Sequence, residues 1–416
     1  MPAAVNRQLP ADVESLVERI DPARAAEAIA GEIVRTPSLA CPDLAALAGG
    51  PVVLKAECLQ LTGSFKLRGA LNKVVALGDA ASPGLVTASA GNHARALAQA
   101  ARICGVGCEV FMPVDAPVSK VAAAEGAGAS VRLAGASVDE ALKLASERSE
   151  ETGEPLVHPF DDVDVIAGQG TLGLELAQDV AGIARVLIPL GGGGLAAGVA
   201  VALRSAGVDA ELVGVQAAAC APFAAALAGR HVASAQLASG ATIADGIAVK
   251  KPGRITLPLV STLLDRVVTV EEDDIAAAMV FLAETVKLVA EGAGAVGVAA
   301  LLGGLEPVAG TTVVVVSGGN VDGGLLASLL RRHETEEGRR VRLFTFVPDR
   351  PGGLSDLLSL VASERANLVT LEHVREAVEL HVRETGVELT LETRGREHTG
   401  RLVAALEAAG YEVALR

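Results

Sequence analysis

Short apolar segments alternate with longer amphipathic segments over the first 330 residues of the chain. The short segments are rich in β-branched residues, as in GLVTAS, CEVFMP, ASVRLA, ARVLIPL, AELVGVQ and TTVVVV, and they predict buried strands. The longer segments, such as NHARALAQAARIC, SVDEALKLASERSEE and EDDIAAAMVFLAETVKLVA, carry apolar residues at helical spacing. Strands that alternate with helices favour an open parallel sheet of the α/β class. Ligands of such sheets bind beyond the carboxyl ends of the strands.

The pattern changes near residue 331. Residues 331–340, RRHETEEGRR, are charged and lack apolar periodicity, so they are interpreted as a linker. Residues 341–416 predict strand, helix, two strands, helix and strand, which is the βαββαβ order of a ferredoxin-like unit. The sequence therefore predicts an α/β domain over 1–330 and a small second domain over 341–416.

Charge and composition exclude some classes of partner. The formal net charge of −15 argues against nucleic acid or an anionic membrane, because both require basic patches on the protein. No apolar run is long enough to span a membrane, and the first residues, MPAAVNRQLPADVES, lack a secretory signal pattern. We therefore expect a cytoplasmic protein that acts on a small molecule.

Four small-residue turns follow predicted strands, and the first contains a lysine. In LTGSFKLRGA, Lys66 lies beside Phe65 at the start of a predicted helix. A lysine that acts as a nucleophile must be partly desolvated, and a turn beside an aromatic ring can provide this. Such an amine could form a Schiff base with a carbonyl cofactor. A surface lysine in a tight turn is the alternative.

The next two turns suit anions. In SAGNHARA, Ser89 and Asn92 can cap a helix start whose free N–H groups bind an anion, although simple capping is the alternative. In PLGGGGLAAG, the glycines at 191–194 allow several backbone N–H groups to surround a phosphate at a helix N-terminus. A nicotinamide dinucleotide is disfavoured there, because the next strand ends in Gln216 and not in an acidic residue.

The fourth turn, SGGN, ends the predicted strand TTVVVV. The hydroxyl of Ser317 can bond to a ring nitrogen without charging it, whereas a plain strand-to-helix turn is the alternative. An aldehyde for Lys66, a phosphate for the glycines and a heterocyclic nitrogen for Ser317 together describe one ligand. The sequence therefore predicts pyridoxal 5′-phosphate, with Lys66 as its Schiff-base lysine.

These motifs, in this order, resemble the threonine dehydratase branch of the fold-type-II pyridoxal-phosphate enzymes. The similar segments span about 55–320 and include KAECLQLTGSFKLRGA, TASAGNHARALA, IPLGGGGLAAG, ADGIAV, EGAGAVGVAAL and VVVVSGGN. The resemblance implies a tryptophan synthase β-like fold of two lobes with parallel sheets, the smaller lobe being inserted at about 80–160. It also implies deamination of L-threonine to 2-oxobutanoate and ammonia, and of L-serine to pyruvate.

The same resemblance implies roles for individual residues. Lys66 would anchor the cofactor and remove the substrate α-proton. The implied cofactor-binding set is Phe65, Lys66, Asn92, Gly191, Gly192, Gly193, Gly194, Leu195 and Ser317. The implied site for the substrate carboxylate is Ser89, Ala90, Gly91, Asn92 and His93. For His93, a solvent-facing position at the helix start is an equal alternative.

Three positions depart from the pattern of the resembled enzymes. Ala90 stands where the related serine racemases carry a second serine, which disfavours racemisation. Gln216 has no carboxylate nearby in the sequence, so no metal-ligand set is predicted. Arg95 stands where the family often has glutamine, and nothing in the sequence explains it.

Residues 341–416, with DRPGGL after the first strand, resemble an ACT domain. Such domains pair side by side and often bind an amino acid where the glycine-rich turn meets the first helix, so a homodimer or homotetramer is expected. The implied effector contacts are Asp349, Arg350, Pro351, Gly352, Gly353, Leu354 and Asn367. A pairing module without a ligand is the alternative.

Other functions remain open at this stage. One is a dehydratase of a different β-hydroxy amino acid, such as serine or 3-hydroxyaspartate. Another is a non-catalytic amino-acid sensor, which the intact Lys66, Asn92 and Ser317 argue against. A nicotinamide dehydrogenase is a third. Pocket size, which would distinguish the hydroxy amino acids, cannot be read from the sequence.

Overall fold

The chain folds as two units, Met1–Asp322 and Gly323–Arg416. The computed structural model describes residues 9–229, 242–374 and 383–416. None of the helices in these ranges is long and apolar enough to cross a membrane. Each unit has its own apolar core, as the change of sequence pattern predicts.

A six-stranded sheet forms the larger lobe of the first unit. Its strands, in spatial order, are β1 (Ser38–Ala40), β2 (Val52–Ala56), β9 (Thr311–Val316), β6 (Ile183–Pro189), β7 (Glu211–Ala217) and β8 (Arg266–Val270). All neighbours are parallel except β1, which pairs antiparallel with β2 at one edge. The predicted open parallel sheet of the α/β class is therefore confirmed.

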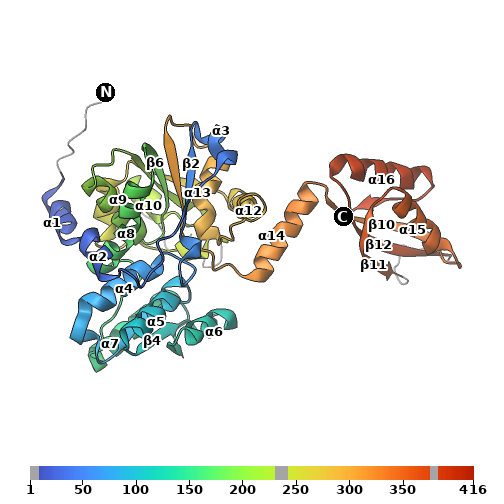
Figure 1. The fold of residues 1–416 in the computed structure, drawn as a ribbon. Coiled ribbons are helices and arrows are strands. Elements are labelled where there is room, and N and C mark those ends of the chain that lie inside the picture. Colours follow the sequence, from blue (N-terminus) through green and yellow to red (C-terminus); the bar gives the residue numbers. More distant parts are fainter. Residues whose placement is uncertain (1–8, 230–241, 375–382) are drawn as a thin grey trace. The chain divides into compact units, whose positions relative to one another are not determined.

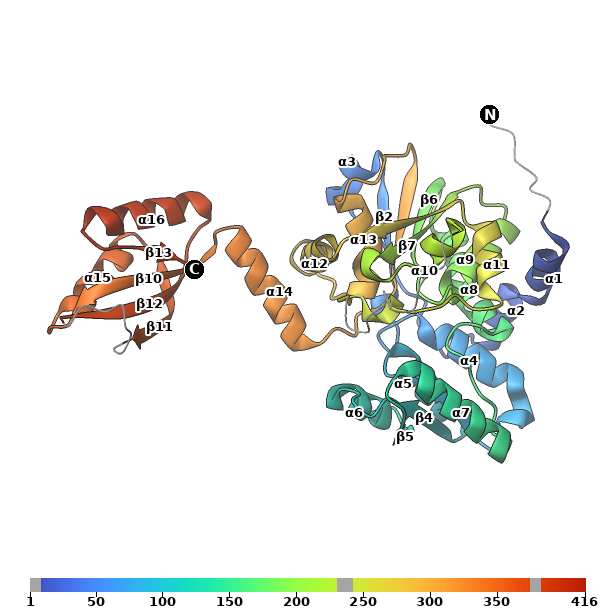
Figure 2. The ribbon, with the colours of Figure 1, turned by 180° about the vertical axis from the view of Figure 1, so that it is seen from behind.

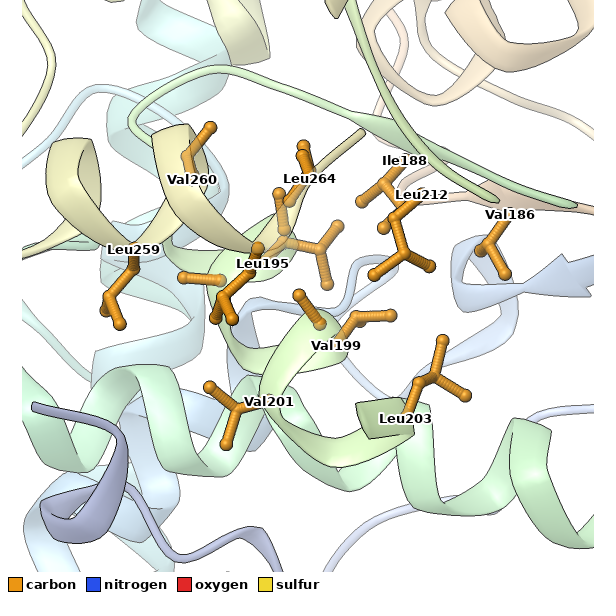
Figure 3. Packing of buried hydrophobic residues seen from close by; sticks show 14 of the residues in the cluster. Val186, Ile188, Leu195, Val199, Val201, Leu203, Leu212, Leu259, Val260 and Leu264 are labelled. Carbon is orange, nitrogen blue, oxygen red and sulfur yellow. The ribbon is translucent and has the colours of Figure 1, made fainter. Parts of the chain in front are cut away.

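Helices cover both faces of this sheet (Figure 1 and Figure 2). On one face, α8 (Val163–Asp179), α9 (Gly194–Ser205) and α11 (Thr256–Leu263) pack into a core with alternate residues of β6 (Figure 3). On the other face lies α13 (Gly292–Leu302). Because both faces are buried, the strands are almost continuously apolar. Their sequences therefore show runs of Val, Leu and Ile and no alternation with polar residues.

A three-stranded parallel sheet forms the smaller lobe, with β3 (Leu85–Ala88), β4 (Cys108–Met112) and β5 (Ser130–Leu133). On one face, α5 (Asn92–Cys104) and α4 (Lys66–Leu77) share a core with the sheet. On the opposite face lies α7 (Val138–Thr152), and α6 (Val118–Gly126) lies beside β5. The other α-helices in the described part of the first unit are α1 (Ala11–Arg19), α2 (Pro22–Ala28), α3 (Ala45–Ala48), α10 (Pro222–Leu227) and α12 (Glu272–Phe281).

The four turns identified in the sequence follow the carboxyl ends of strands β2, β3, β6 and β9. The turns after β2 and β9 are bonded to each other through their backbones. Phe65 N donates to Ser317 O at 3.1 Å, and Gly319 N donates to Gly63 O at 2.9 Å. Two turns that are far apart in the sequence are thereby placed together next to the start of α4.

One predicted helix is shorter than its periodicity suggests. The segment EDDIAAAMVFLAETVKLVA forms α12 and then a single π-helical turn over Leu282–Val286. Lys287 has a left-handed backbone with φ of 65°, which ends the helix. Residues 287–290 therefore form a loop that leads into Glu291, whose N–H donates to Gly318 O at 3.0 Å.

The second unit contains α14 (Gly323–Glu336), β10 (Arg340–Pro348), α15 (Gly353–Ser363), β11 (Asn367–Val374), β12 (Glu384–Glu392), α16 (Arg396–Ala408) and β13 (Ala414–Leu415). Its antiparallel sheet has the order β11-β12-β10-β13. From β10 onwards the predicted βαββαβ order is confirmed.

The prediction of a linker over 331–340 is wrong for its first six residues, because residues 331–336 continue α14. The unit boundary also falls after Asp322 and not near residue 330. The charged run is compatible with helix because Arg332 and Glu336, four residues apart, form an ion pair at 2.7 Å. The lack of apolar residues indicates that this segment is exposed, but an exposed segment can still be helical.

Candidate active site

Lys66 is the first residue of α4, in the turn that follows β2. Its Nζ donates to Pro159 O at 2.8 Å and lies 5.2 Å from the ring centroid of Phe65. Burial lowers the pKa of Lys66 to about 8, against an opposing effect of Glu291. At pH 7 this leaves roughly one amine in ten neutral, whereas an ordinary lysine is almost wholly charged. The geometry supports a nucleophilic amine.

A buried charged network holds the start of α4. Arg68, two residues after Lys66, has no exposed side-chain surface. Its guanidinium bonds to both carboxylate oxygens of Glu57, at 2.8 and 2.9 Å, and to both oxygens of Glu175, at 2.7 and 3.0 Å. Lys55 Nζ also reaches Glu175, at 2.6 Å. Two cations and two anions are thus paired around the helix that carries Lys66.

Glu291 faces the amide of Asn92 and was not among the predicted site residues. Asn92 Nδ2 donates to Glu291 Oε1 at 2.6 Å, and Asn92 Oδ1 accepts from Asn320 Nδ2 at 2.7 Å. Burial, together with the nearby charge of Asp245, raises the pKa of Glu291 to about 7. Its signal in the sequence is a lone acid at the head of EGAGAVGVAAL, where an apolar, small-residue helix offers no reason for a carboxylate.

The turn SAGN differs in detail from the expected cap. Gly91 occupies the N-cap position of α5, and Asn92 is the first helical residue, so Asn92 does not cap the helix. Ser89 Oγ instead accepts from Gly91 N at 3.2 Å. Ala90 packs against the core of the smaller lobe. The side chain of Asn92 is therefore free to face Glu291.

His93 is buried, which rules out its solvent-facing alternative. Only 2% of the residue is exposed, and Nε2 lies 3.2 Å from Val157 O. Burial and the charge of Lys66 lower the pKa of His93 to about 3, so the imidazole is neutral. Its Nδ1 has no hydrogen-bond partner within the described ranges. His93 therefore presents one unpaired, buried polar atom.

The glycine turn after β6 forms a cradle of unpaired donors. Residues 191–195 are buried, and their N–H groups donate to no acceptor in the part of the chain that the structure describes. They lie at the N-terminus of the twelve-residue helix α9, where the helix dipole favours an anion. A Cβ at Gly192 would come within 2.3 Å of the Phe160 ring, and Gly193 has φ of +93°. Larger residues would close the cradle.

Ser317 follows directly after β9 and is 3% exposed. Its Oγ lies 3.4 Å from Ala293 O, which is long for a hydroxyl hydrogen bond and leaves capacity for another partner. The site therefore contains a neutralisable amine, buried unpaired N–H donors and an incompletely bonded hydroxyl. These groups fit the aldehyde, the phosphate and the ring nitrogen of pyridoxal 5′-phosphate.

A separate cavity of about 320 Å³ lies in the second unit. It is lined by Val347, Pro348, Asp349, Arg350, Pro351, Leu354, His373 and Thr385. Four of the seven predicted effector contacts line it, and Gly352 and Gly353 belong to the same turn. Asn367 does not line it: its Nδ2 bonds to Glu392 Oε2 at 2.9 Å, at the opposite end of β11 from His373. Only the His373 end of β11 lies at the cavity, and the sequence alone does not show which end of the strand this is.

Comparison with known proteins agrees with the chemistry of the first site. A family model described as "Pyridoxal-phosphate dependent enzyme" matches residues 29–319. The chain belongs to this family of pyridoxal-phosphate-dependent enzymes, and its cofactor is pyridoxal 5′-phosphate.

The relatives within this family are more specific. The chain is 44% identical to the L-threonine ammonia-lyase of Thermotoga maritima, over 89% of this chain and 92% of that protein. It is 43% identical to the L-threonine ammonia-lyase of Geobacter sulfurreducens, over 88% and 91%. Among solved structures, the threonine deaminase of T.th. has a TM-score of 0.68 and 39% identity, covering 73% of this chain and 98% of that one. The structure of maize serine racemase has a TM-score of 0.70 and 34% identity, covering 77% of this chain and 98% of that one.

The rate of cofactor attachment is expected to depend on pH through Lys66. The neutral amine is the reactive form, and its pKa is about 8. The second-order rate at which the apoprotein gains the absorbance of covalently bound pyridoxal 5′-phosphate should therefore rise about tenfold per pH unit below 8 and level off above it. Pyridoxine 5′-phosphate, which has no aldehyde, should bind without this slope. A rate that kept rising to about pH 10, the range of an ordinary lysine, would contradict the lowered pKa.

Proposed function

We propose that this protein is a pyridoxal-phosphate-dependent threonine ammonia-lyase, which converts L-threonine to 2-oxobutanoate and ammonia and L-serine to pyruvate and ammonia. The observation that carries the proposal is that the Lys66 amine bonds to Pro159 O, and that the next residue, Phe160, packs against Gly192 and Gly194 of the cradle of unpaired N–H groups at 191–195. The similarity to two L-threonine ammonia-lyases over nearly their whole length supports the choice of reaction.

Different residues of the site would bind different parts of the cofactor and substrate. The N–H groups of residues 191–195 would bind the phosphate, and Ser317 Oγ would bond to the ring nitrogen. Asn92 Nδ2, which also donates to Glu291, would bond to the phenolic oxygen. The turn at 89–93 would receive the substrate carboxylate. A neutral serine beside the ring nitrogen suits elimination, because it does not fully charge the ring.

Proton transfer depends on Lys66. The cofactor, when bound, would withdraw electrons from the amino acid and make the α-hydrogen acidic. Lys66 Nζ, with its lowered pKa, would remove this proton and hold it as an ammonium. The β-hydroxyl would take up a proton from the Lys66 ammonium and leave as water, and a later water molecule would replace the amino nitrogen, which is released as ammonia. The surrounding turns exclude bulk water, because Ser317, His93 and Glu291 are nearly completely buried.

A substrate panel tests this proposal. The purified holoenzyme is assayed for 2-oxo acid and ammonia with L-threonine, L-serine, L-3-hydroxyaspartate and D-serine, with the visible spectrum recorded before and after each addition. We expect the highest kcat/KM for L-threonine and no interconversion of L- and D-serine, because Ala90 provides no hydroxyl for the opposite face. A higher kcat/KM for another hydroxy amino acid would identify the protein as a dehydratase of that amino acid and not of L-threonine. Binding without release of ammonia would favour a sensor.

We also propose that the second unit is an ACT domain that binds an amino acid. The cavity near its first turn has room for one, and Asp349 and Arg350 offer opposite charges for the ammonium and carboxylate groups. The residues that support this proposal come from β10, the turn before α15, β11 and β12.

The effector site has its own test. Calorimetric titration of the full-length holoenzyme with L-isoleucine and L-valine, which have no β-hydroxyl to eliminate, should detect one ligand of the second unit. Arg350→Ala should weaken binding of this ligand at least about tenfold and leave kcat/KM in the absence of the ligand unchanged. Arg401→Ala, which replaces an exposed arginine on α16, should change neither quantity. Equal affinity of both variants for the ligand would show that the cavity is not the effector site.

Self-association and location complete the proposal. The edge strand β11 exposes Leu368 and Val369, which are each 38% exposed, and this supports side-by-side pairing in a homodimer or homotetramer. Light scattering of the full chain would measure the subunit number. A cytoplasmic location is proposed from the substrate class.

A further inference from the structure

Arg95 has no role in the proposed reaction, yet its side chain bonds to a residue of the site. It lies three residues after Asn92 on α5, so both side chains project from the same face of that helix. Its guanidinium Nη1 donates to Oδ1 of Asn320, the last residue of the SGGN turn in the other lobe. The residue that the sequence could not explain is therefore connected to the turn that holds Ser317.

The contacts of Asn320 have a defined direction. Arginine can only donate hydrogen bonds, so the amide atom of Asn320 that faces Arg95 must be the oxygen. The amide nitrogen then faces two acceptors, Thr62 O at 2.9 Å and Asn92 Oδ1 at 2.7 Å. The Thr62 carbonyl can only accept, so it requires the same orientation. Arg95 and Thr62 thus fix the amide from both sides.

The direction passes on to Asn92. Because Asn320 donates to it, Asn92 must present Oδ1 to Asn320 and Nδ2 to Glu291, at 2.6 Å. The second hydrogen of Asn92 Nδ2 is left for the cofactor. A glutamine at position 95 could offer either its oxygen or its nitrogen, so the orientation would then depend on the acceptors Thr62 O and Glu291 alone. Arginine adds an obligatory donor, which further disfavours the reversed orientation.

The Asn320 amide also packs closely against the turn after β2. A Cβ at Gly63 would come within 2.5 Å of Asn320 Oδ1, so a side chain at position 63 would displace the amide. Thr62, Asn92 and Asn320 belong to the turns after β2, β3 and β9, respectively. One amide thereby connects three of the four turns of the site.

We propose that Arg95 is a positioning residue: through Asn320 it sets the donor–acceptor direction of the Asn320–Asn92 pair, so that the NH₂ group of Asn92 faces the phenolic oxygen of the cofactor. This proposal rests on the proposed function, because it takes the phenolic oxygen to lie beside Asn92. It predicts that loss of Arg95 alters the protonation of the bound cofactor and not only the stability of the fold.

Absorption spectra of the holoenzyme without substrate test the proposal. At a fixed pH, the ratio of the long-wavelength to the short-wavelength band of the bound cofactor reports whether its phenolic oxygen is ionised. Arg95→Ala and Arg95→Gln should lower this ratio about three- to tenfold, the effect of one weakened hydrogen bond. Arg95→Lys, which still only donates, should stay within about twofold of the wild type. Arg102→Ala, an exposed arginine on the same helix, is the matched control.

A double-variant comparison separates positioning from general damage. Asn320→Ala should lower the ratio as far as Arg95→Ala, and the double variant should lower it no further, because Arg95 acts through Asn320. Additive effects, equal effects of the Lys and Ala variants, or an unchanged ratio in Arg95→Ala would each overturn the proposal. A wild-type protein that binds no pyridoxal 5′-phosphate would instead overturn the proposed function.

Discussion

Replacement of Lys66 by alanine is expected to lower kcat for L-threonine by at least about 10³-fold, because the proposed mechanism requires this side chain both to anchor the cofactor and to move the α-proton. The fold should persist, since within the described ranges the amine bonds only to Pro159 O and lies over the Phe65 ring. Release of 2-oxo acid by the variant is the measurement. The visible band of covalently bound cofactor should be absent, while the phosphate cradle should still bind pyridoxal 5′-phosphate reversibly.

The matched control is Lys143→Ala on α7. Lys143 has 79% of its side chain exposed and pairs only with Glu147 among the described residues, at 3.8 Å, so its loss should leave both the spectrum and kcat unchanged. Addition of methylamine to the Lys66→Ala variant should restore part of the activity if the missing amine is the cause. Retention of full turnover in Lys66→Ala would remove this residue from its role.

Replacement of Arg68 by alanine is expected to have the largest effect on stability. The guanidinium is fully buried and pairs with Glu57 and Glu175, and its pKa is raised by these carboxylates despite burial. Its loss leaves the buried Glu175 with Lys55 as its remaining cation, and leaves the buried Glu57 with the hydroxyl of Thr36 and no cation among the described residues. The free energy of unfolding should fall by about 3 to 5 kcal/mol, measured by urea denaturation of the apoprotein.

A second arginine provides the comparison for Arg68. Arg35 bonds to Asp179 at 2.5 Å, but 53% of its side chain is exposed. Arg35→Ala should cost no more than about 1 kcal/mol, because water screens an exposed pair and solvates the carboxylate that remains. Similar losses in the two variants would mean that the network around Arg68 is not stabilised by its charges. Arg68→Lys should be intermediate, since an ammonium cannot make paired bonds to two carboxylates.

Local patterns predicted most of the elements that build the site. The strands before each turn and the helix α5, Asn92–Cys104, follow directly from apolar runs and helical spacing. Small-residue turns at strand ends located Lys66, the glycine cradle and Ser317, because each motif lies within a few consecutive residues. Errors arose where exposure was confused with irregular structure, as in α14, and where one left-handed residue, Lys287, ended a helix.

Contacts between distant segments could not be predicted in this way. Glu291 and Asn320 are 199 and 228 residues from Asn92, and neither has a local pattern that names its partner. The position of Asn367 depends on the direction of β11, which the antiparallel pairing with β12 decides. The burial of His93 likewise follows from packing of its helix against the segment that contains Val157.

The amino-acid sequence by itself determined the α/β class, the two-part organisation, the cofactor and the candidate Schiff-base lysine, because periodicity and turn composition act over short stretches of chain. Only the tertiary structure decided which way the amide of Asn92 faces, that the charges of Glu291 and Lys66 affect each other's pKa, and that Arg95 bonds to Asn320. Hydrogen-bond direction and burial depend on groups brought together from separate turns, and a linear sequence does not contain those distances.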